Sequence, residues 1–118
     1  LIENGRVIRP DIGITRVYQT DAGLLIASLT PGGPAERAGL RGFRIVREQR
    51  RRGPFIYEEQ RIDRGYADLI VAVDGQRVRT ADDLLTIIEG HRPGDEVVVT
   101  IVREQEQVNV GVVLGEGD

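Results

Sequence analysis

The apolar residues of this chain come in short runs, and each run ends at a turn-forming residue. Three runs have the length of a single strand and are rich in branched aliphatic side chains; they lie at 24–29, 69–73 and 96–103. Segment 12–18 alternates apolar and polar residues, as a half-buried strand does. Asp74-Gly75 is a tight-turn dipeptide, and another strand is expected at 107–114. The pattern therefore predicts five or six short strands.

Two helices are expected, one very short and one longer. Residues 34–39 begin with Pro and end with Gly, which suits a single helical turn with a left-handed stop. Thr80 and Asp83 form a variant of the capping box, which opens a second helix that ends near Gly90. The apolar residues of this helix are Leu84, Leu85, Ile87 and Ile88. Together these elements predict an α+β fold, a small barrel-like sheet with helices at its ends.

Charge is spread unevenly along the chain. The net charge is -3, yet seven Arg oppose four acidic residues between positions 42 and 66. Apolar residues alternate with polar ones on both sides of Gly53-Pro54; they are Phe43, Ile45, Phe55 and Tyr57. This pattern predicts a protruding hairpin whose apolar side chains need a partner surface. Arg50–Arg52 beside the turn would equally suit a mobile segment.

Catalysis by this chain is not expected. It contains one His and one Ser, and Ser28 lies in an apolar strand without the Gly-x-Ser-x-Gly setting of an activated nucleophile. We interpret His91, which lies in a Pro-Gly loop, as an exposed loop residue. There is no Cys and no group of ligands with a recognised metal spacing, so neither a metal nor another cofactor is expected.

Nucleic acids and membranes are not expected as partners either. The triplet Arg50–Arg52 is short and has Glu residues close to it in an acidic chain, whereas nucleic-acid-binding domains carry a basic surface. No apolar run approaches the roughly 20 residues of a membrane-spanning helix, so direct insertion into a membrane is not predicted.

Five motifs in order resemble one known family. They are Arg9-Pro-Asp-Ile-Gly-Ile14, Pro31-Gly-Gly-Pro-Ala-Glu-Arg-Ala-Gly-Leu40, Asp68-Leu-Ile-Val-Ala-Val-Asp-Gly75, the helix opened by Thr80, and Pro93-Gly-Asp-Glu96. Their order and spacing resemble the PDZ domain of HtrA/DegP-type serine proteases, across nearly the whole chain except residues 42–66. The resemblance implies a PDZ-like, partly open β-barrel of five to six strands capped by two helices. It also implies the circularly permuted bacterial topology, with 42–66 as an added hairpin.

The resemblance also implies what the chain is part of. Residues 1–9 resemble the segment that joins a protease domain to its first PDZ domain, so we predict a linker at 1–9 and a PDZ domain at 10–116. The first residue is Leu and the chain has no Met, which fits a piece of a longer protein. The implied parent is a serine protease of protein quality control, bacterial or organellar, located in the periplasm or cell envelope.

The same resemblance, supported by backbone chemistry, indicates a peptide-binding site. Successive backbone N–H groups in a tight loop bind a carboxylate without a buried cation. Ile12, Gly13 and Ile14 are expected to supply these donors, with Gly13 allowing a close approach and the two Ile side chains forming the floor of an apolar pocket. From Ile14 through Thr15 and Arg16, the strand edge would pair with an incoming peptide as an added antiparallel strand.

The second wall of the site is predicted on the helix opened by Thr80. Aligned to the family, Ala81, Leu85 and Ile88 form the stripe that faces the groove, while Leu84 and Ile87 belong to the core. The alternative is that all five side chains are core residues.

Two Arg residues near this site have competing interpretations. Arg16 would favour an acidic or polar residue upstream of the peptide terminus, or is simply a solvated residue of the strand edge. For Arg9 a surface or linker role is favoured over contact with the carboxylate through water.

Two functions follow from these interpretations. The first is capture of C-terminal or unfolded peptide segments between residues 12–14 and 80–90. The alternative is a structural role, in which the domain packs on its own protease domain or on neighbouring subunits. The hairpin at 42–66 is predicted to make such a contact, or else to pack only on itself.

Overall fold

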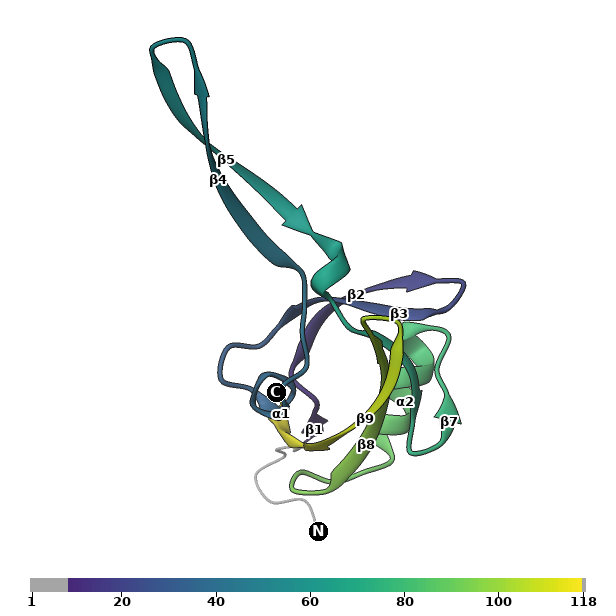
Figure 1. Ribbon diagram of the computed structural model, residues 1–118. Coiled ribbons are helices and arrows are strands. Elements are labelled where there is room, and N and C mark those ends of the chain that lie inside the picture. The colour runs from purple at the N-terminus through teal and green to yellow at the C-terminus, as the bar shows by residue number, and fades with distance from the viewer. Residues whose placement is uncertain (1–8, 118) are drawn as a thin grey trace.

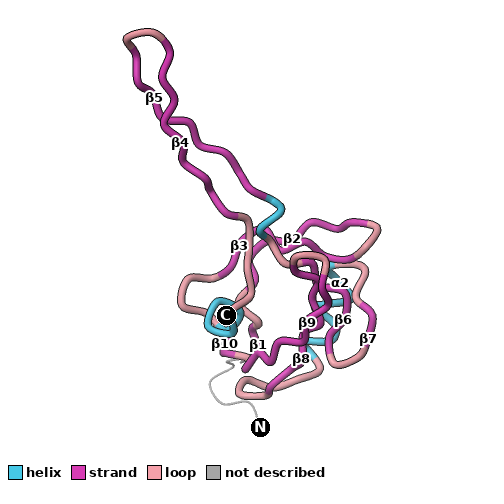
Figure 2. Tube along the Cα trace, viewed as in Figure 1, coloured by secondary structure: helices cyan, strands magenta, loops and turns pink. Residues whose placement is uncertain are grey.

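The computed structural model describes residues 9–117, which form ten strands, two α-helices and one 3-10 helix. The strands are β1 (Arg9–Asp11), β2 (Ile14–Thr20), β3 (Gly23–Leu29), β4 (Arg44–Arg52), β5 (Phe55–Asp63), β6 (Leu69–Val73), β7 (Gln76–Arg77), β8 (Glu96–Arg103), β9 (Glu106–Val113) and β10 (Gly115–Gly117). The helices are α1 (Pro34–Ala38), the 3-10 helix η1 (Arg64–Tyr66) and α2 (Ala81–Glu89). Strands dominate the trace, as Figure 2 shows.

The main sheet is open and antiparallel, with strand order β2-β3-β6-β8-β9 and β7 paired to β6. Two further pairs, β1 with β10 and β4 with β5, form separate two-stranded sheets, and β1 and β10 lie side by side in Figure 2. The predicted barrel of five to six strands is therefore corrected to an open six-stranded sheet. The β1–β10 pair was not predicted, because its three-residue strands are too short to produce an alternating pattern.

Both predicted helices are confirmed, together with their caps. Gly39 follows α1 with φ of 92°, the left-handed stop that glycine accepts without a Cβ clash. At the start of α2, Thr80 Oγ1 accepts a hydrogen bond from Asp83 N at 3.1 Å, and Asp83 Oδ2 accepts one from Thr80 N at 3.2 Å. The backbone hydrogen bonds from Arg79 and Thr80 lower the pKa of Asp83 below its ordinary 3.8. The helix ends at Gly90, as predicted.

The hydrophobic core fills the space between the main sheet and the two helices. Helix α2 contributes Leu84 and Ile88, which are one helical turn apart and nearly inaccessible to solvent. The remaining buried side chains come mainly from the central strands; they include Leu24, Ile26, Ile70, Val73, Val97, Val99, Ile101 and Val112. The helix also packs beside β1.

Residues 44–63 form a long antiparallel hairpin that projects from the body of the domain (Figure 1). Its two strands are joined at Gly53-Pro54, with Gly53 at φ of 59°, as the first central position of a type II′ turn requires. The longest dimension is 69 Å, and the radius of gyration is 17.4 Å, against roughly 13 Å for a compact domain of about this size. The hairpin accounts for this elongation.

The base of the hairpin is attached to the body through a buried ion pair. Asp68 is fully buried and accepts hydrogen bonds from Arg103 Nε at 2.8 Å and from Arg103 Nη2 at 2.6 Å. Its second oxygen also accepts from Arg41 N at 2.9 Å, just before the hairpin begins. The hydrogen bond to Asp68 raises the pKa of Arg103 above its ordinary value. The two ends of the hairpin are thus tied to β8.

Phe43 departs from the predicted pattern. We expected its ring to need a partner surface with the other hairpin side chains, but it stacks on Tyr18 of β2 with ring centroids 5.6 Å apart and planes 7° apart. The guanidinium of Arg64 covers the Phe43 ring at 5.6 Å. The Phe43 ring therefore packs against residues of the domain itself. The exposed apolar side chains of the hairpin begin only at Ile45.

Candidate functional site

An apolar groove of about 250 Å³ lies between β2 and α2. Its strand side is formed by residues from Pro10 to Val17, and its helix side by the first two turns and a half of α2. The lining residues are Pro10, Asp11, Ile12, Ile14, Thr15, Arg16, Val17, Ala81, Leu84, Leu85 and Ile88. A groove of this size holds a few side chains of an extended chain rather than a folded partner.

The structure brings seven of the eight predicted site residues to this groove. Those seven are Ile12, Ile14, Thr15, Arg16, Ala81, Leu85 and Ile88, and the eighth, Gly13, lies in the loop behind them. Sequence reasoning missed Pro10, Asp11 and Val17. For Val17 the reason is the irregular register of β2, which shifts between Ile14 and Arg16 and again between Arg16 and Val17. Such bulges break the strict alternation from which facing residues are predicted.

The loop at the closed end of the groove depends on Gly13. Its φ is +83°, and a Cβ there would lie 2.8 Å from Pro34 Cδ. Both the left-handed backbone and the close approach of the α1 N-terminus therefore require glycine. Gly13 O accepts a hydrogen bond from Thr30 N at 2.8 Å, and Gly13 N donates to Asp11 Oδ1 at 3.1 Å. Ile12 N has no hydrogen-bond partner among residues 9–117.

Strand β2 is the edge of the main sheet, because it pairs only with β3 within the described part of the chain. Its outer edge faces the groove, so its backbone groups there are open to an added strand. At the far end Gln19 Oε1 accepts a hydrogen bond from Ala81 N at 3.1 Å. This bond joins β2 to the start of α2 beyond Val17, the last strand residue that lines the groove.

The helix wall differs in detail from the prediction. Leu85 exposes 54% of its surface to the open groove, and Ala81 is also exposed. Leu84 and Ile88 both line the groove from below while being buried in the core. The assignment of Leu84 to the core alone is therefore incomplete. Ile87 is half-buried, packs against the core and does not line the groove, as expected.

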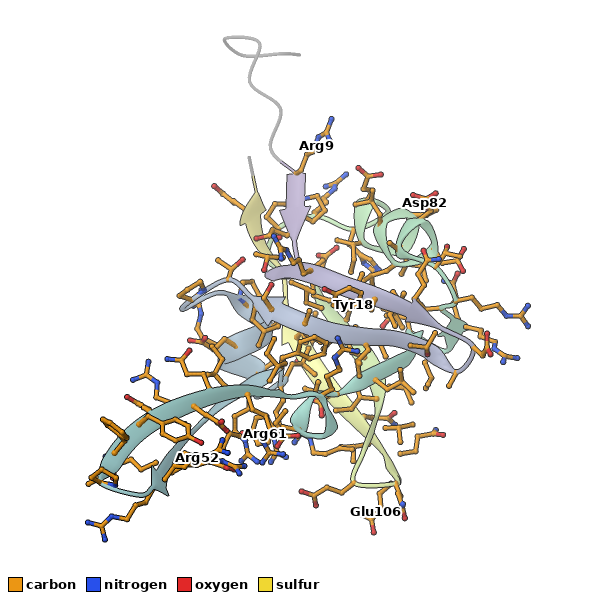
Figure 3. The ribbon with its side chains drawn as sticks, turned by 90° about the horizontal axis from the view of Figure 1, so that it is seen from above. Arg9, Tyr18, Arg52, Arg61, Asp82 and Glu106 are labelled. Carbon is orange, nitrogen blue, oxygen red and sulfur yellow. The ribbon has the colours of Figure 1, made fainter. Side chains whose placement is uncertain are left out.

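Two charged residues, Asp11 and Arg16, line the groove on its strand side, and the helix side of the lining is apolar. Helix α2 carries Asp82, Asp83 and Glu89 and no basic residue, and Figure 3 shows Asp82 on the outer surface of the helix. On the strand side Arg16 lines the groove. Arg9 points away from the body of the domain in Figure 3, and its guanidinium lies 3.9 Å from Glu89.

The two residues considered for catalysis lie apart from each other. Ser28 Oγ is 2.6 Å from Thr15 Oγ1, and His91 does not contact it. The interpretation of His91 as an exposed loop residue is wrong: the imidazole is half-buried between Asp74, at 3.2 Å, and Asp95, at 3.6 Å. Asp74 comes from a distant turn, so the chain sequence offers no signal for this contact.

Neither a metal site nor a membrane span is found in the described part of the chain. Among residues 9–117, no three His, Cys, Asp or Glu side chains converge as metal ligands would. None of the described helices is long and apolar enough to cross a membrane.

Comparison with known proteins identifies the family to which this fold belongs. A family model described as a PDZ domain matches residues 10–114. Protease Do-like 1, chloroplastic, from Arabidopsis thaliana is 32% identical over 97% of this chain and 24% of its own length. A probable periplasmic serine endoprotease DegP-like from Halomonas elongata is 31% identical over 80% of this chain and 15% of its own length. This chain therefore spans about a quarter or less of these relatives.

A solved structure shows the same fold at lower sequence identity. The HtrA-type protease AlgW with decapeptide matches 98% of this chain and 31% of its own, with a TM-score of 0.70 and 20% identity. At that identity the similarity shows the fold alone, whereas the family match and the relatives at 31 and 32% identity carry the assignment. This chain belongs to the PDZ domain family, and the proteins it resembles are HtrA/DegP-type serine proteases.

Proposed function

We propose that this domain binds extended or C-terminal peptide segments by strand addition between β2 and α2. The observation that carries the proposal is the free edge of β2 beside an apolar groove in which Leu85 is 54% exposed. Backbone hydrogen bonds along β2 would supply affinity for any sequence, and the pocket around Ile14 and Leu85 would select an apolar side chain. The similar HtrA-type protease AlgW was solved with a decapeptide, which supports a peptide as the partner proposed for this chain.

The expected affinity is modest. A few backbone hydrogen bonds at about 1 kcal/mol each and one filled pocket must offset the ordering of the peptide. A dissociation constant of micromolar order, or about 8 kcal/mol, is the expected result. Weak capture of this kind suits the delivery of many different substrates to one protease.

The test is an NMR titration of the domain with peptides prepared both as free acids and as C-terminal amides. Chemical-shift changes at residues 12–16 and at Leu85 are expected with at least one form. Leu85→Ser should weaken binding about tenfold, because burying a leucine contributes more than the 1.4 kcal/mol that tenfold represents. Val113→Ser is the matched control, since Val113 is 57% exposed and lies outside the groove. Absence of shifts with every peptide would overturn the proposal.

Arg16 is proposed to set a preference upstream of the peptide end. It is a charged residue of the groove lining, while the helix side of that lining is apolar, formed by Ala81, Leu84, Leu85 and Ile88. Matched peptides with Glu or Lys two or three residues from the end should differ in affinity, with Glu tighter. Equal affinities would remove Arg16 from the site.

The activity and location of the parent protein are also proposals. The relative from Halomonas elongata is called a probable periplasmic serine endoprotease, and the relative from Arabidopsis thaliana is called a chloroplastic protease. We propose a serine protease of the periplasm or cell envelope as parent, with this chain as a non-catalytic module for substrate delivery or regulation. The linker at 1–9 and the domain limits 10–116 remain predictions, and residues 1–8 lie outside the described part of the chain. The circular permutation, and the status of 42–66 as an insertion into the family fold, remain predictions too.

A second function, contact with a protease domain or a neighbouring subunit, is supported by the hairpin. Its exposed apolar side chains are Ile45, Phe55, Ile56, Tyr57 and Ile62. A two-stranded hairpin is marginally stable alone in water, so side chains of this kind at 40 to 71% exposure favour a folded partner surface.

This contact is tested in the full-length parent by replacing residues 45–62 with Asn-Gly. Loss of the native subunit assembly, measured by sedimentation, is the expected result. Arg47→Ala, a single change on the exposed hairpin surface, should leave assembly intact. Unchanged assembly and unchanged proteolysis after the replacement would exclude a role for the hairpin in contact.

A further inference from the structure

The carboxylate of Asp11 occupies a position that a peptide carboxylate would need. Asp11 lines the groove, and its Oδ1 accepts the hydrogen bond of Gly13 N at 3.1 Å. Gly13 N is the middle donor of the loop formed by Ile12, Gly13 and Ile14. A ligand that places a carboxylate on this loop must therefore displace a carboxylate of the domain itself.

The position of Asp11 is set by the sheet rather than by the loop. Asp11 is the last residue of β1, and its backbone is in register with Gly115 of β10. A Cβ on Gly117 would lie 3.0 Å from Asp11 Cβ, so the paired strand also packs closely against this side chain. Because the backbone is held, only rotation of the Asp11 side chain can release Gly13 N. The Asp11 carboxylate therefore stays near the loop and competes with a ligand unless its side chain rotates away.

The nearby basic side chains do not neutralise Asp11, which has no ion-pair partner among residues 9–117. Helix α2 carries Asp82, Asp83 and Glu89 outside the groove lining and has no basic residue. Arg9 lies within 3.9 Å of Glu89, and Arg16 lies on the strand further along the groove. A second negative charge at the loop would meet Asp11 at hydrogen-bond range, where like charges repel most strongly. An uncharged backbone carbonyl at the same place would not be repelled by the Asp11 carboxylate.

We infer that Asp11 is a built-in competitor for terminal carboxylates, and that the groove selects internal, extended segments of unfolded chains over free C-termini. This inference rests on the proposed peptide-binding function and names its substrate class. Asp11 is in this sense a specificity-determining residue. An internal segment pairs with the edge of β2 through its backbone and fills the pocket between Ile14 and Leu85 without displacing Asp11.

The rival explanation is that Asp11 prepares the loop for a carboxylate. A side-chain carboxylate that bonds the N–H two residues on forms an Asx turn, which orders the backbone. Under that explanation, removing Asp11 would weaken the binding of free acids. The two explanations therefore predict opposite signs for the same substitution.

The test measures Kd for one apolar-ended peptide as free acid and as C-terminal amide, by fluorescence polarisation, with the wild-type domain and three variants. Asp11→Ala removes both the charge and the hydrogen bond, whereas Asp11→Asn keeps an acceptor for Gly13 N without the charge. Glu116→Gln is the matched control, since Glu116 is exposed and lies opposite Pro10 on the paired strand. Amide NMR spectra confirm that each variant is folded.

The expected quantity is the ratio of the amide Kd to the acid Kd. It should lie below one for the wild type and for Glu116→Gln, which means tighter binding of the amide, because both keep the Asp11 carboxylate at the loop. In Asp11→Ala it should rise about tenfold through tighter binding of the acid, the scale of one charge-assisted hydrogen bond. Asp11→Asn should also rise, because the charge repulsion is gone.

Three results would overturn the inference. One is a wild type that binds the acid at least as tightly as the amide, and another is a ratio unchanged in both Asp11 variants. The third is weaker acid binding by Asp11→Ala. In these cases peptides still bind, so the proposed function survives. Binding of neither form to any variant would overturn the proposed function as well.

Discussion

At the scale of single residues, Asp68 and Arg103 form the interaction on which the attachment of the hairpin depends. The Asp68 carboxylate has no exposed surface and is satisfied by the guanidinium and by Arg41 N. Arg103 Nη2 also donates to Gly39 O at 2.8 Å, so one side chain joins β8 to the end of α1. A buried charge of this kind is tolerated only while its partners remain.

We predict that Arg103→Met destabilises the domain by about 3–5 kcal/mol, because it leaves the Asp68 charge buried and unpaired. Urea unfolding measures this loss. Arg47→Met, on the exposed hairpin, is the control and should change stability by less than about 0.5 kcal/mol. Combining Arg103→Met with Asp68→Asn should recover part of the loss. A loss below about 1 kcal/mol in the single variant would show that the pair is not needed.

At the scale of elements, α2 is the part that the sequence predicts best. Its start is specified by Thr80 and Asp83, whose side chains satisfy backbone donors within three residues of themselves. Strand β2 is harder to predict, because its bulges arise from pairing with β3 and change which residues face the groove. Local hydrogen bonds can be read from adjacent residues, whereas a register shift depends on a distant strand.

The cap of α2 predicts a dependence of stability on pH. Backbone hydrogen bonds from Arg79 and Thr80 lower the pKa of Asp83 in the folded state below its ordinary 3.8. The unfolded chain therefore binds the proton more tightly, and the contribution of Asp83 is complete above pH 3.8. It is lost as the pH falls from there through the lowered folded-state value.

Thermal unfolding between pH 5 and pH 2 tests this contribution. Asp83→Asn should show a shallower fall in stability with acid than the wild type. Asp82→Asn removes a neighbouring charge but no cap hydrogen bond. Its stability should therefore fall with acid at a rate closer to that of the wild type than the rate of Asp83→Asn. Identical slopes for Asp83→Asn and the wild type would contradict the assignment.

At the scale of the whole molecule, the hairpin and the body behave as separate structural units. No residue from 43 to 66 belongs to the buried core. The hairpin is held together by its own ladder and by exposed ion pairs, among them Arg50 with Glu59 at 2.8 Å and Arg44 with Asp63 at 2.7 Å. Exposed pairs contribute little to stability, so the body does not depend on them.

We predict that the isolated domain tolerates replacement of residues 45–62 by Asn-Gly, a dipeptide that favours a two-residue hairpin turn. The melting temperature should move by less than about 4 °C, the change expected of under 1 kcal/mol in a domain of this size. The radius of gyration, measured by small-angle scattering, should fall from 17.4 Å toward about 13 Å. A large loss of stability would mean that the hairpin is part of the folding unit.

The sequence by itself determined the features that depend on neighbouring residues. The strand runs, the glycine stop after α1, the capping box at Thr80 and the Gly53 turn all follow from short-range sterics and hydrogen bonds. The family could also be predicted from the sequence, because the order and spacing of these local motifs are visible in it. The groove residues Ile14 and Leu85 were predicted from the resemblance of the loop at 12–14 and of the helix opened by Thr80 to the family.

Only the tertiary structure decided the contacts between segments far apart in the chain. The pairing of β1 with β10 holds Asp11 beside the loop, and the stacking of Phe43 on Tyr18 removes that ring from the exposed hairpin surface. The half-burial of His91 between two aspartates has the same origin. Such contacts depend on the packing of the whole sheet, so no short pattern encodes them. For this reason the sequence predicts where a peptide would bind, while the preference for one kind of peptide over another is argued from the folded loop.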